Sequence, residues 1–154
     1  MKYEDLLYLD CELQLNFLID QDINLIIRLH QLKVSSEETQ VEDFPIYARE
    51  IFVDDSLPEF ELHFENYVSF HCDNESYSHF ETGFKGKSFR IYGQSILQKY
   101  VEKHTDALAI LECDNDFKRS DLVHYEIITS NSIISILTIN PPSVKKVFNT
   151  TESE

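Results

Sequence analysis

The chain has 154 residues, 42% of them hydrophobic, and a formal net charge of −15 at pH 7. This length corresponds to about one domain, since domains of roughly 100–200 residues are usual, and the hydrophobic content suffices for one buried core. The chain has no run of about 18 apolar residues, the length that a membrane-spanning helix needs. Its negative charge disfavours binding to nucleic acid or to anionic membranes. We expect a single domain over residues 1–148 and a flexible acidic tail at 149–154.

The first third of the chain predicts a short helix followed by strands. Residues 4–33 are rich in apolar side chains whose spacing fits either a helical face or strict strand alternation. We expect a short opening helix, a turn at 20–22, and a strand over 23–32, where β-branched residues favour extended backbone. Residues 35–44 are polar and acidic and predict a surface loop.

Alternation between apolar and polar residues is clearer from Pro45 onward. It predicts three strands, at 46–53, 59–64 and 67–72, with a turn at 54–58. A second turn is expected at 83–87, where two of the three glycines lie. The five residues after it, 88–92, predict a fourth strand.

The rest of the chain predicts one helix and a hairpin. Residues 95–104 fit an amphipathic helix with Ser95 as its expected N-cap. The side chains expected to face inward are Ile96, Leu97, Tyr100 and Val101. Two strands, 123–129 and 133–139, form a hairpin that ends at a pair of prolines. Together these elements predict an α+β fold, mainly antiparallel sheet with one or two packed helices in a single domain.

Negative charge is concentrated between Val34 and Thr82. This segment holds thirteen acidic residues and one basic residue, Arg49. A surface of one sign raises the local concentration of partners of opposite sign and speeds their association. We therefore expect a basic protein as the partner. The acids expected to form the binding surface are Glu37, Glu38, Glu42, Asp43, Asp54, Asp55, Glu59, Glu61 and Glu65.

Motifs for metal, nucleotide or nucleophilic chemistry are missing from the sequence. The six histidines lack metal-ligand spacing, and there is neither a glycine-rich phosphate loop nor a serine nucleophile elbow. Cys11, Cys72 and Cys113 are scattered without paired spacing, which predicts buried, reduced thiols in a cytoplasmic protein. We accordingly expect no enzyme activity, no cofactor and no metal.

A second interpretation places a small enzyme or ligand-binding site at residues 71–79. Polar side chains are dense there and could converge on an aromatic pocket. The candidates are His71, Asn74, Glu75, Tyr77 and His79. A structure without a concave pocket at these residues would exclude this interpretation.

A third interpretation is a structural or regulatory subunit. Two strongly acidic surfaces would repel each other, so any dimer is expected to use the apolar edge of the strand at 133–139. A basic stretch with interleaved aromatics has the composition of a nucleic-acid stripe: Lys85, Lys87, Arg90, Lys99 and Lys103. Because the whole chain is acidic, we expect this stretch to complement the acidic segment within the molecule.

Three segments, taken in order, carry a family resemblance. They are Tyr67-Val68-Ser69-Phe70 leading into Asn74-Glu75-Ser76-Tyr77, the stretch 86–95, and His124-Tyr125-Glu126-Ile127 followed by 133–136 and Pro141. This order resembles a family of small bacterial proteins that accompany polymorphic or contact-dependent toxins and are regarded as immunity proteins. The resemblance covers residues 44–146. The family pattern usually has a histidine where this chain has Ser132.

The resemblance and the charge predict the same function. Many secreted bacterial toxins are basic nucleases, and an acidic inhibitor gains association rate and specificity against such a partner. The leading hypothesis is a non-enzymatic, cytoplasmic immunity protein against contact-dependent growth inhibition. It is expected to bind and neutralise a basic toxin, a nuclease domain encoded nearby, and to bind neither nucleic acid nor membrane.

Overall fold

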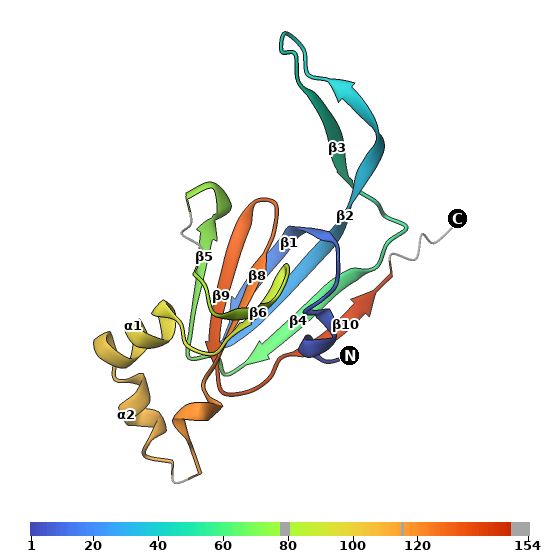
Figure 1. Ribbon diagram of the computed structural model, residues 1–154. Helices are drawn as coiled ribbons and strands as arrows, with labels where there is room; N and C mark the ends of the chain where they lie inside the picture. The colour runs from blue at the N-terminus through green and yellow to red at the C-terminus, as the bar shows by residue number, and fades with distance from the viewer. Residues whose placement is uncertain (78–80, 115, 149–154) are drawn as a thin grey trace.

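The structure, a computed structural model, describes residues 1–77, 81–114 and 116–148. These residues form two five-stranded antiparallel sheets that share one hydrophobic core, with two short α-helices beside them (Figure 1). The prediction of an α+β fold, mainly antiparallel and in a single domain, is confirmed. The expected tail at 149–154 lies outside the described residues.

Sheet A has the strand order β1-β2-β4-β10, with β3 also pairing with β2. Its strands are β1 (Glu12–Gln21), β2 (Asn24–Gln40), β3 (Tyr47–Val53), β4 (Glu59–Glu65) and β10 (Ser143–Val147). Sheet B has the order β5-β9-β8-β7-β6. Its strands are β5 (Ser69–Asn74), β6 (Phe84–Gly86), β7 (Phe89–Tyr92), β8 (Val123–Ile128) and β9 (Ser132–Thr138).

The core lies between the two sheets and follows the two-residue period of the strands. Alternate residues of β2 and β4 are fully buried, as in Leu25, Ile27 and Leu29 of β2. From sheet B, β8 and β9 contribute alternate large apolar side chains to the same cluster. The 3₁₀ helix η1 (Tyr3–Leu6) closes one end: the Tyr3 hydroxyl donates to the Glu126 backbone oxygen at 2.8 Å. The predicted short opening helix corresponds to η1, and the predicted strands after it correspond to β1 and β2, so both predictions are confirmed.

The helices lie beside sheet B. Helix α1 (Ile96–His104) begins at Ser95, whose Oγ accepts the Gln98 N–H at 3.1 Å, so the predicted cap is confirmed. Leu97 and Val101 are buried as predicted, whereas Ile96 and Tyr100 are exposed. Leu97 and Val101 pack with Leu137 of β9 and with helix α2 (Ala107–Leu111), forming a second, smaller cluster. No helix in the described part of the chain is long and apolar enough to cross a membrane.

Three sequence expectations about elements are wrong, and two elements were missed. Residues 35–44 are not a loop, because β2 continues to Gln40. The expected turn at 83–87 contains the short strand β6. Helix α2 and strand β10 were not predicted. Strand β9 offers no edge for a dimer, since it pairs with β5 on one side and with β8 on the other.

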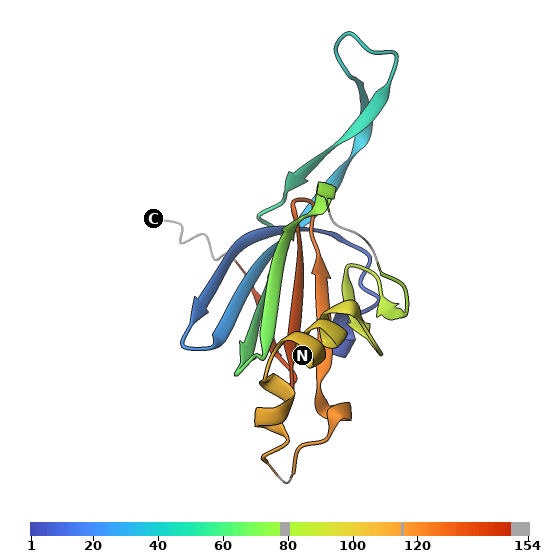
Figure 2. The same cartoon turned by 90° about the vertical axis from the view of Figure 1, so that its left-hand side faces the viewer.

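The outer half of β2 and the whole of β3 leave the body of the molecule as a hairpin, which we call the arm (residues 33–53). It stands clear of both sheets in the two views (Figures 1 and 2). The pairing register shifts between Val34 and Glu38, where β2 has two more residues than β3. Such a bulge bends a strand and increases its twist. The arm is therefore directed away from the two packed sheets rather than along them.

Candidate functional site

The arm exposes both of its faces. Every residue of β3 is exposed, and so is nearly all of β2 beyond Lys33. Eight large apolar side chains of the arm are exposed, including Phe44 at 58% and Tyr47 at 64%. The eight are Val34, Val41, Phe44, Ile46, Tyr47, Ile51, Phe52 and Val53. An isolated two-stranded hairpin is marginally stable in water, and grouped exposed apolar side chains mark an interaction site.

The arm is also acidic. Four of the nine predicted partner-binding acids lie on it and are exposed: Glu37, Glu38, Glu42 and Asp43. Glu50 adds a fifth carboxylate. Arg49 lies directly across the hairpin from Glu38, and their charged atoms are 3.5 Å apart. An exposed pair of this kind contributes little to stability, so the arm keeps a net negative surface available to a partner.

Asp54 and Asp55 lie in the turn at the base of the arm. Asp55 is exposed, whereas Asp54 accepts hydrogen bonds from the backbone and side chain of Ser56 and from Lys33 Nζ. The Ser56 hydroxyl is the main cause of the lowered Asp54 pKa, followed by the Ser56 backbone. Asp54 thus organises the turn, and Asp55 is the freer of the two acids for a partner.

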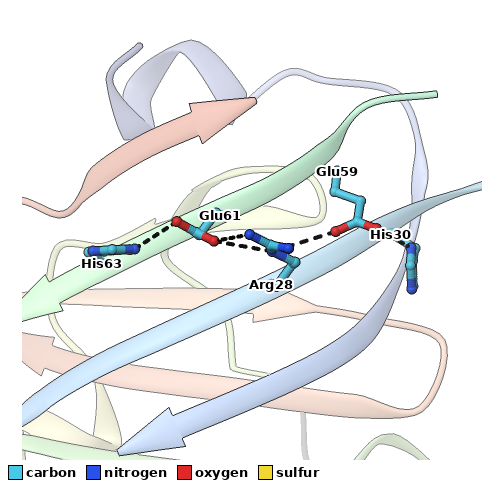
Figure 3. Close-up of polar contacts among 5 residues, drawn as sticks. All are labelled: Arg28, His30, Glu59, Glu61 and His63. Atoms are coloured by element: carbon cyan, nitrogen blue, oxygen red, sulfur yellow. Dashed lines mark hydrogen bonds and ion pairs between the residues drawn. The ribbon is translucent and has the colours of Figure 1, made fainter. Parts of the chain in front are cut away.

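The prediction that Glu59 and Glu61 belong to an open acidic surface is wrong. Both lie on the outer face of sheet A in a row of charged side chains across β2 and β4 (Figure 3). Arg28 hydrogen-bonds to Glu61 and lies 3.5 Å from Glu59, which is only 5% exposed. His30 lies 3.2 Å from Glu59, and His63 lies 2.9 Å from Glu61.

This row of side chains stabilises the pairing of β2 with β4. Arg28 and Glu61 are direct cross-strand partners, and opposite charges in that position stabilise strand pairing. Hydrogen bonding from Arg28 is the largest cause of the lowered pKa of Glu61. The carboxylates of both glutamates already contact Arg28 or histidine side chains of the sheet, so neither is free to bind a basic partner. Glu65, at the end of β4, is exposed, but it lies at the opposite end of that strand from the arm.

Sheet B carries a pocket on the face turned away from the core. Cross-strand pairing places polar residues of three strands side by side there: His71 of β5 opposite Ser135 of β9, and Ser135 opposite Glu126 of β8. Helix α1 covers one end of this face, as Figure 2 shows. The pocket has a volume of about 670 Å³. Its lining residues are His71, Asp73, Asn74, Glu81, Ile96, Leu97, Tyr100, His124, Glu126, Ile133 and Ser135.

Glu126 lies at the floor of this pocket and is held by three donors. Its Oε1 accepts the Tyr92 hydroxyl at 2.7 Å and Arg90 Nη1 at 3.3 Å, and its Oε2 accepts the Ser135 hydroxyl at 3.3 Å. Burial, followed by the hydrogen bond to Glu126, raises the pKa of Tyr92. Tyr92 therefore stays a neutral donor, and the carboxylate keeps one orientation.

His124 is the most unusual residue of the pocket. It is 1% exposed, and neither of its ring nitrogens hydrogen-bonds to any described residue. Its ring stacks on Tyr92 with centroids 4.6 Å apart. Burial, with a smaller contribution from His71, lowers its pKa to about 4. A neutral imidazole with one unpaired donor and one unpaired acceptor is costly to bury, so it favours a polar occupant nearby.

The second sequence interpretation requires a concave pocket near residues 71–79, and the structure has one at part of this segment. His71 and Asn74 line it, as predicted, whereas Glu75 lies in the 3₁₀ helix η2 (Glu75–Tyr77) and does not line it. The side chain of Tyr77 and the whole of His79 lie outside the part of the chain that the structure describes. Sequence reasoning missed Glu126 and Ser135. The signal for Glu126 was its alternation with His124 along β8, and Ser135 stands alone between apolar residues of β9.

The cysteines and the basic stretch also differ from expectation. Cys72 and Cys113 are exposed and Cys11 is half-buried, so the expected burial is wrong, although all three are free thiols. Of the basic stretch, Lys87 pairs with Asp10 and Arg90 with Glu126, both outside the acidic segment. Among the described residues, no group of three or more His, Cys, Asp or Glu side chains is arranged to hold a metal ion.

Comparison with known proteins gives no relative from which a role could be transferred: no family model, no curated protein and no solved structure matches the chain.

Proposed function

We propose that this protein is a non-enzymatic binding protein that neutralises a basic protein toxin by docking on it through the arm. The observation that carries the proposal is the arm itself, a hairpin exposed on both faces, acidic, and rich in large apolar side chains. The apolar side chains supply buried area in a complex, while the acids supply association rate and orientation.

The composition of the arm supports a protein partner over a polyanion. Its five acids would repel nucleic-acid phosphates and anionic lipid headgroups. Its exposed aromatics, Phe44 and Tyr47, are residue types enriched at the centres of protein interfaces. The partner surface that complements the arm carries Lys and Arg around an apolar patch.

The resemblance to immunity proteins supplies the biological context of the proposal. In that context the basic partner is a toxin domain, a nuclease in the simplest case, encoded beside the gene for this protein. Docking of the arm over the toxin's active site or substrate groove would block its activity. No chemistry by this chain is needed for that effect.

The test uses the neighbouring toxin domain in a pulldown and in a toxin-activity assay. Replacing Phe44, Ile46 and Tyr47 together by Ser is expected to abolish capture and neutralisation. The matched control replaces Tyr8, Ile110 and Phe148 by Ser, three residues that are at least as exposed but lie outside the arm. A toxin that is neutralised equally by the arm variant, or that the parent protein fails to bind, contradicts the proposal.

A further inference from the structure

The pocket of sheet B has an acidic lining. Its charged residues are Asp73, Glu81 and Glu126, and no Lys or Arg is among the described residues that line it. The charge of Glu126 is balanced by Arg90, its direct cross-strand partner on β7. Glu81 accepts the backbone N–H of Ile96 at the start of α1. The carboxylate of Asp73 has no described hydrogen-bond or ion-pair partner, and it leaves the pocket with uncompensated negative charge.

The other walls of the pocket are apolar and aromatic. Ile96 and Leu97 of α1 face Ile133 of β9, and the ring of Tyr100 lies beside His71 with centroids 6.4 Å apart. Tyr100 is half exposed, and its ring also lies beside that of His104, with centroids 5.1 Å apart. Aromatic faces attract cations, and aliphatic walls bind methylene groups.

His124 is an independent sign that a polar group occupies this pocket. Its side chain is buried beside Glu126, and both ring nitrogens are unpaired within the described structure. Burying an unpaired polar group destabilises the folded state, so such groups in native proteins have a ligand or an ordered water as partner. A ligand with several N–H donors would satisfy the acceptor nitrogen and the adjacent carboxylates together.

We propose that the pocket binds an organic cation, an ammonium or guanidinium group on an aliphatic stem. The cationic head lies between Asp73 and Glu126, and the stem lies along Ile96, Leu97 and Ile133. The source of the head group is either a small free molecule or a Lys or Arg side chain of a protein. This inference does not depend on the function of the arm, because the two sites lie on different parts of the molecule.

The test is a calorimetric titration of the full chain with agmatine, which carries both head groups on a four-carbon stem. We expect agmatine to bind, and we expect butanol and butyrate, which share the stem but lack a cation, not to bind. Asp73→Asn is expected to weaken agmatine about fivefold, and Glu126→Gln to weaken it more, since a partly buried charge pair is stronger than an exposed one. The matched control, Glu65→Gln, removes an exposed acid of sheet A and is expected to leave the affinity unchanged.

A blocked peptide, acetyl-Gly-Arg-Gly-amide, distinguishes the two sources. Asp73-dependent binding of this peptide assigns the pocket to a basic side chain of a protein, whereas binding of agmatine alone assigns it to a free molecule. Asp73 is exposed and Asn is nearly isosteric, so Asp73→Asn should fold like the parent. The proposal is overturned if agmatine fails to bind, if butanol or butyrate binds equally well, or if Asp73→Asn leaves the agmatine affinity unchanged.

Discussion

At the scale of single residues, His124 makes the stability of the protein depend on pH. Its pKa is lowered to about 4, whereas an imidazole in the unfolded chain titrates near 6.5. Between these values the unfolded state binds the extra proton, so the free energy of unfolding falls as the pH decreases through this window. From pH 7 to pH 5 the loss attributable to His124 is about 2 kcal/mol. His124→Phe keeps a flat ring against Tyr92 and should remove this part of the loss.

Urea unfolding at pH 7 and pH 5 measures the effect. The free energy of unfolding of His124→Phe is expected to change less between the two pH values than that of the parent. His104→Gln, a change of an exposed histidine at the end of α1, should leave the parent's pH dependence intact. An identical pH dependence in the parent and in His124→Phe would show that the imidazole has the same pKa in the folded and unfolded states.

Glu61 gives a pH dependence of a different kind. Because Arg28 lowers its pKa, the ionised carboxylate stabilises the folded state above the unfolded pKa, and this stabilisation is lost as the pH falls through the folded pKa. Glu61→Gln should therefore cost about 1–2 kcal/mol at pH 7 and less at pH 3. Chemical denaturation at both pH values tests this, with the exposed Glu65→Gln as control. An equal cost at the two pH values would rule out a contribution from the charge.

At the scale of elements, the β1–β2 turn contains a local conflict between sequence and backbone. Asp22 and Ile23 both have positive φ, at 50° and 58°, as a two-residue hairpin turn of the mirror-image type requires. A β-branched residue is strained in this conformation, and Ile23 is 58% exposed, so packing compensates only in part. Ile23→Gly should raise the free energy of unfolding by about 1 kcal/mol, as measured by thermal or urea unfolding.

The matched control for that turn is Ile19→Gly. Ile19 is also exposed but lies within β1, where glycine should destabilise the strand. If Ile23→Gly destabilises the protein as Ile19→Gly does, then contacts of the Ile23 side chain outweigh its backbone strain.

The elements also show why some of the fold was predictable from sequence. Strand β4 packs one face on the core, so its apolar residues alternate and its bounds were predicted within one residue. The outer half of β2 packs on neither face, so residues 35–40 carry no alternation and looked like a loop. Strand β10 buries little besides Val144, which is too weak a signal for a prediction.

The candidate sites were predictable to a similar degree. Counting charges along the sequence located the arm acids. These acids are exposed, so their availability does not depend on which residues the fold brings next to them. It failed for Glu59 and Glu61, whose partners on β2 are known only once the strand register is known. The pocket was half predicted for the same reason. His71 and Asn74 stand in one polar segment, whereas His124 and Glu126 reach the site only through the pairing of β8 with β9.

At the scale of the whole molecule, the net charge of −15 can attract a basic partner in two ways: through the electrostatic field of the whole chain and through the local field of the acids on the arm. The two can be separated by neutralising four acids at a time. In the arm variant, Glu37, Glu38, Glu42 and Asp43 are replaced by Gln, Gln, Gln and Asn. In the control, Glu4, Glu12, Glu65 and Asp106, which are exposed and lie outside the arm, are replaced in the same way. Both variants therefore change the net charge by the same amount.

Association rates with the basic toxin domain, measured at low and high salt, then show which field steers the encounter. Screening acts within about 10 Å at 0.1 M salt, so charges close to the interface dominate the rate at physiological ionic strength. The arm variant is expected to associate about tenfold more slowly at low salt, with a flatter salt dependence, and the control much less so. Neither variant should change the free energy of unfolding by more than about 0.5 kcal/mol, since exposed acids contribute little to stability. Equal slowing in both variants would mean that total charge, rather than the arm, attracts the partner, and docking would then have to be sought on another face.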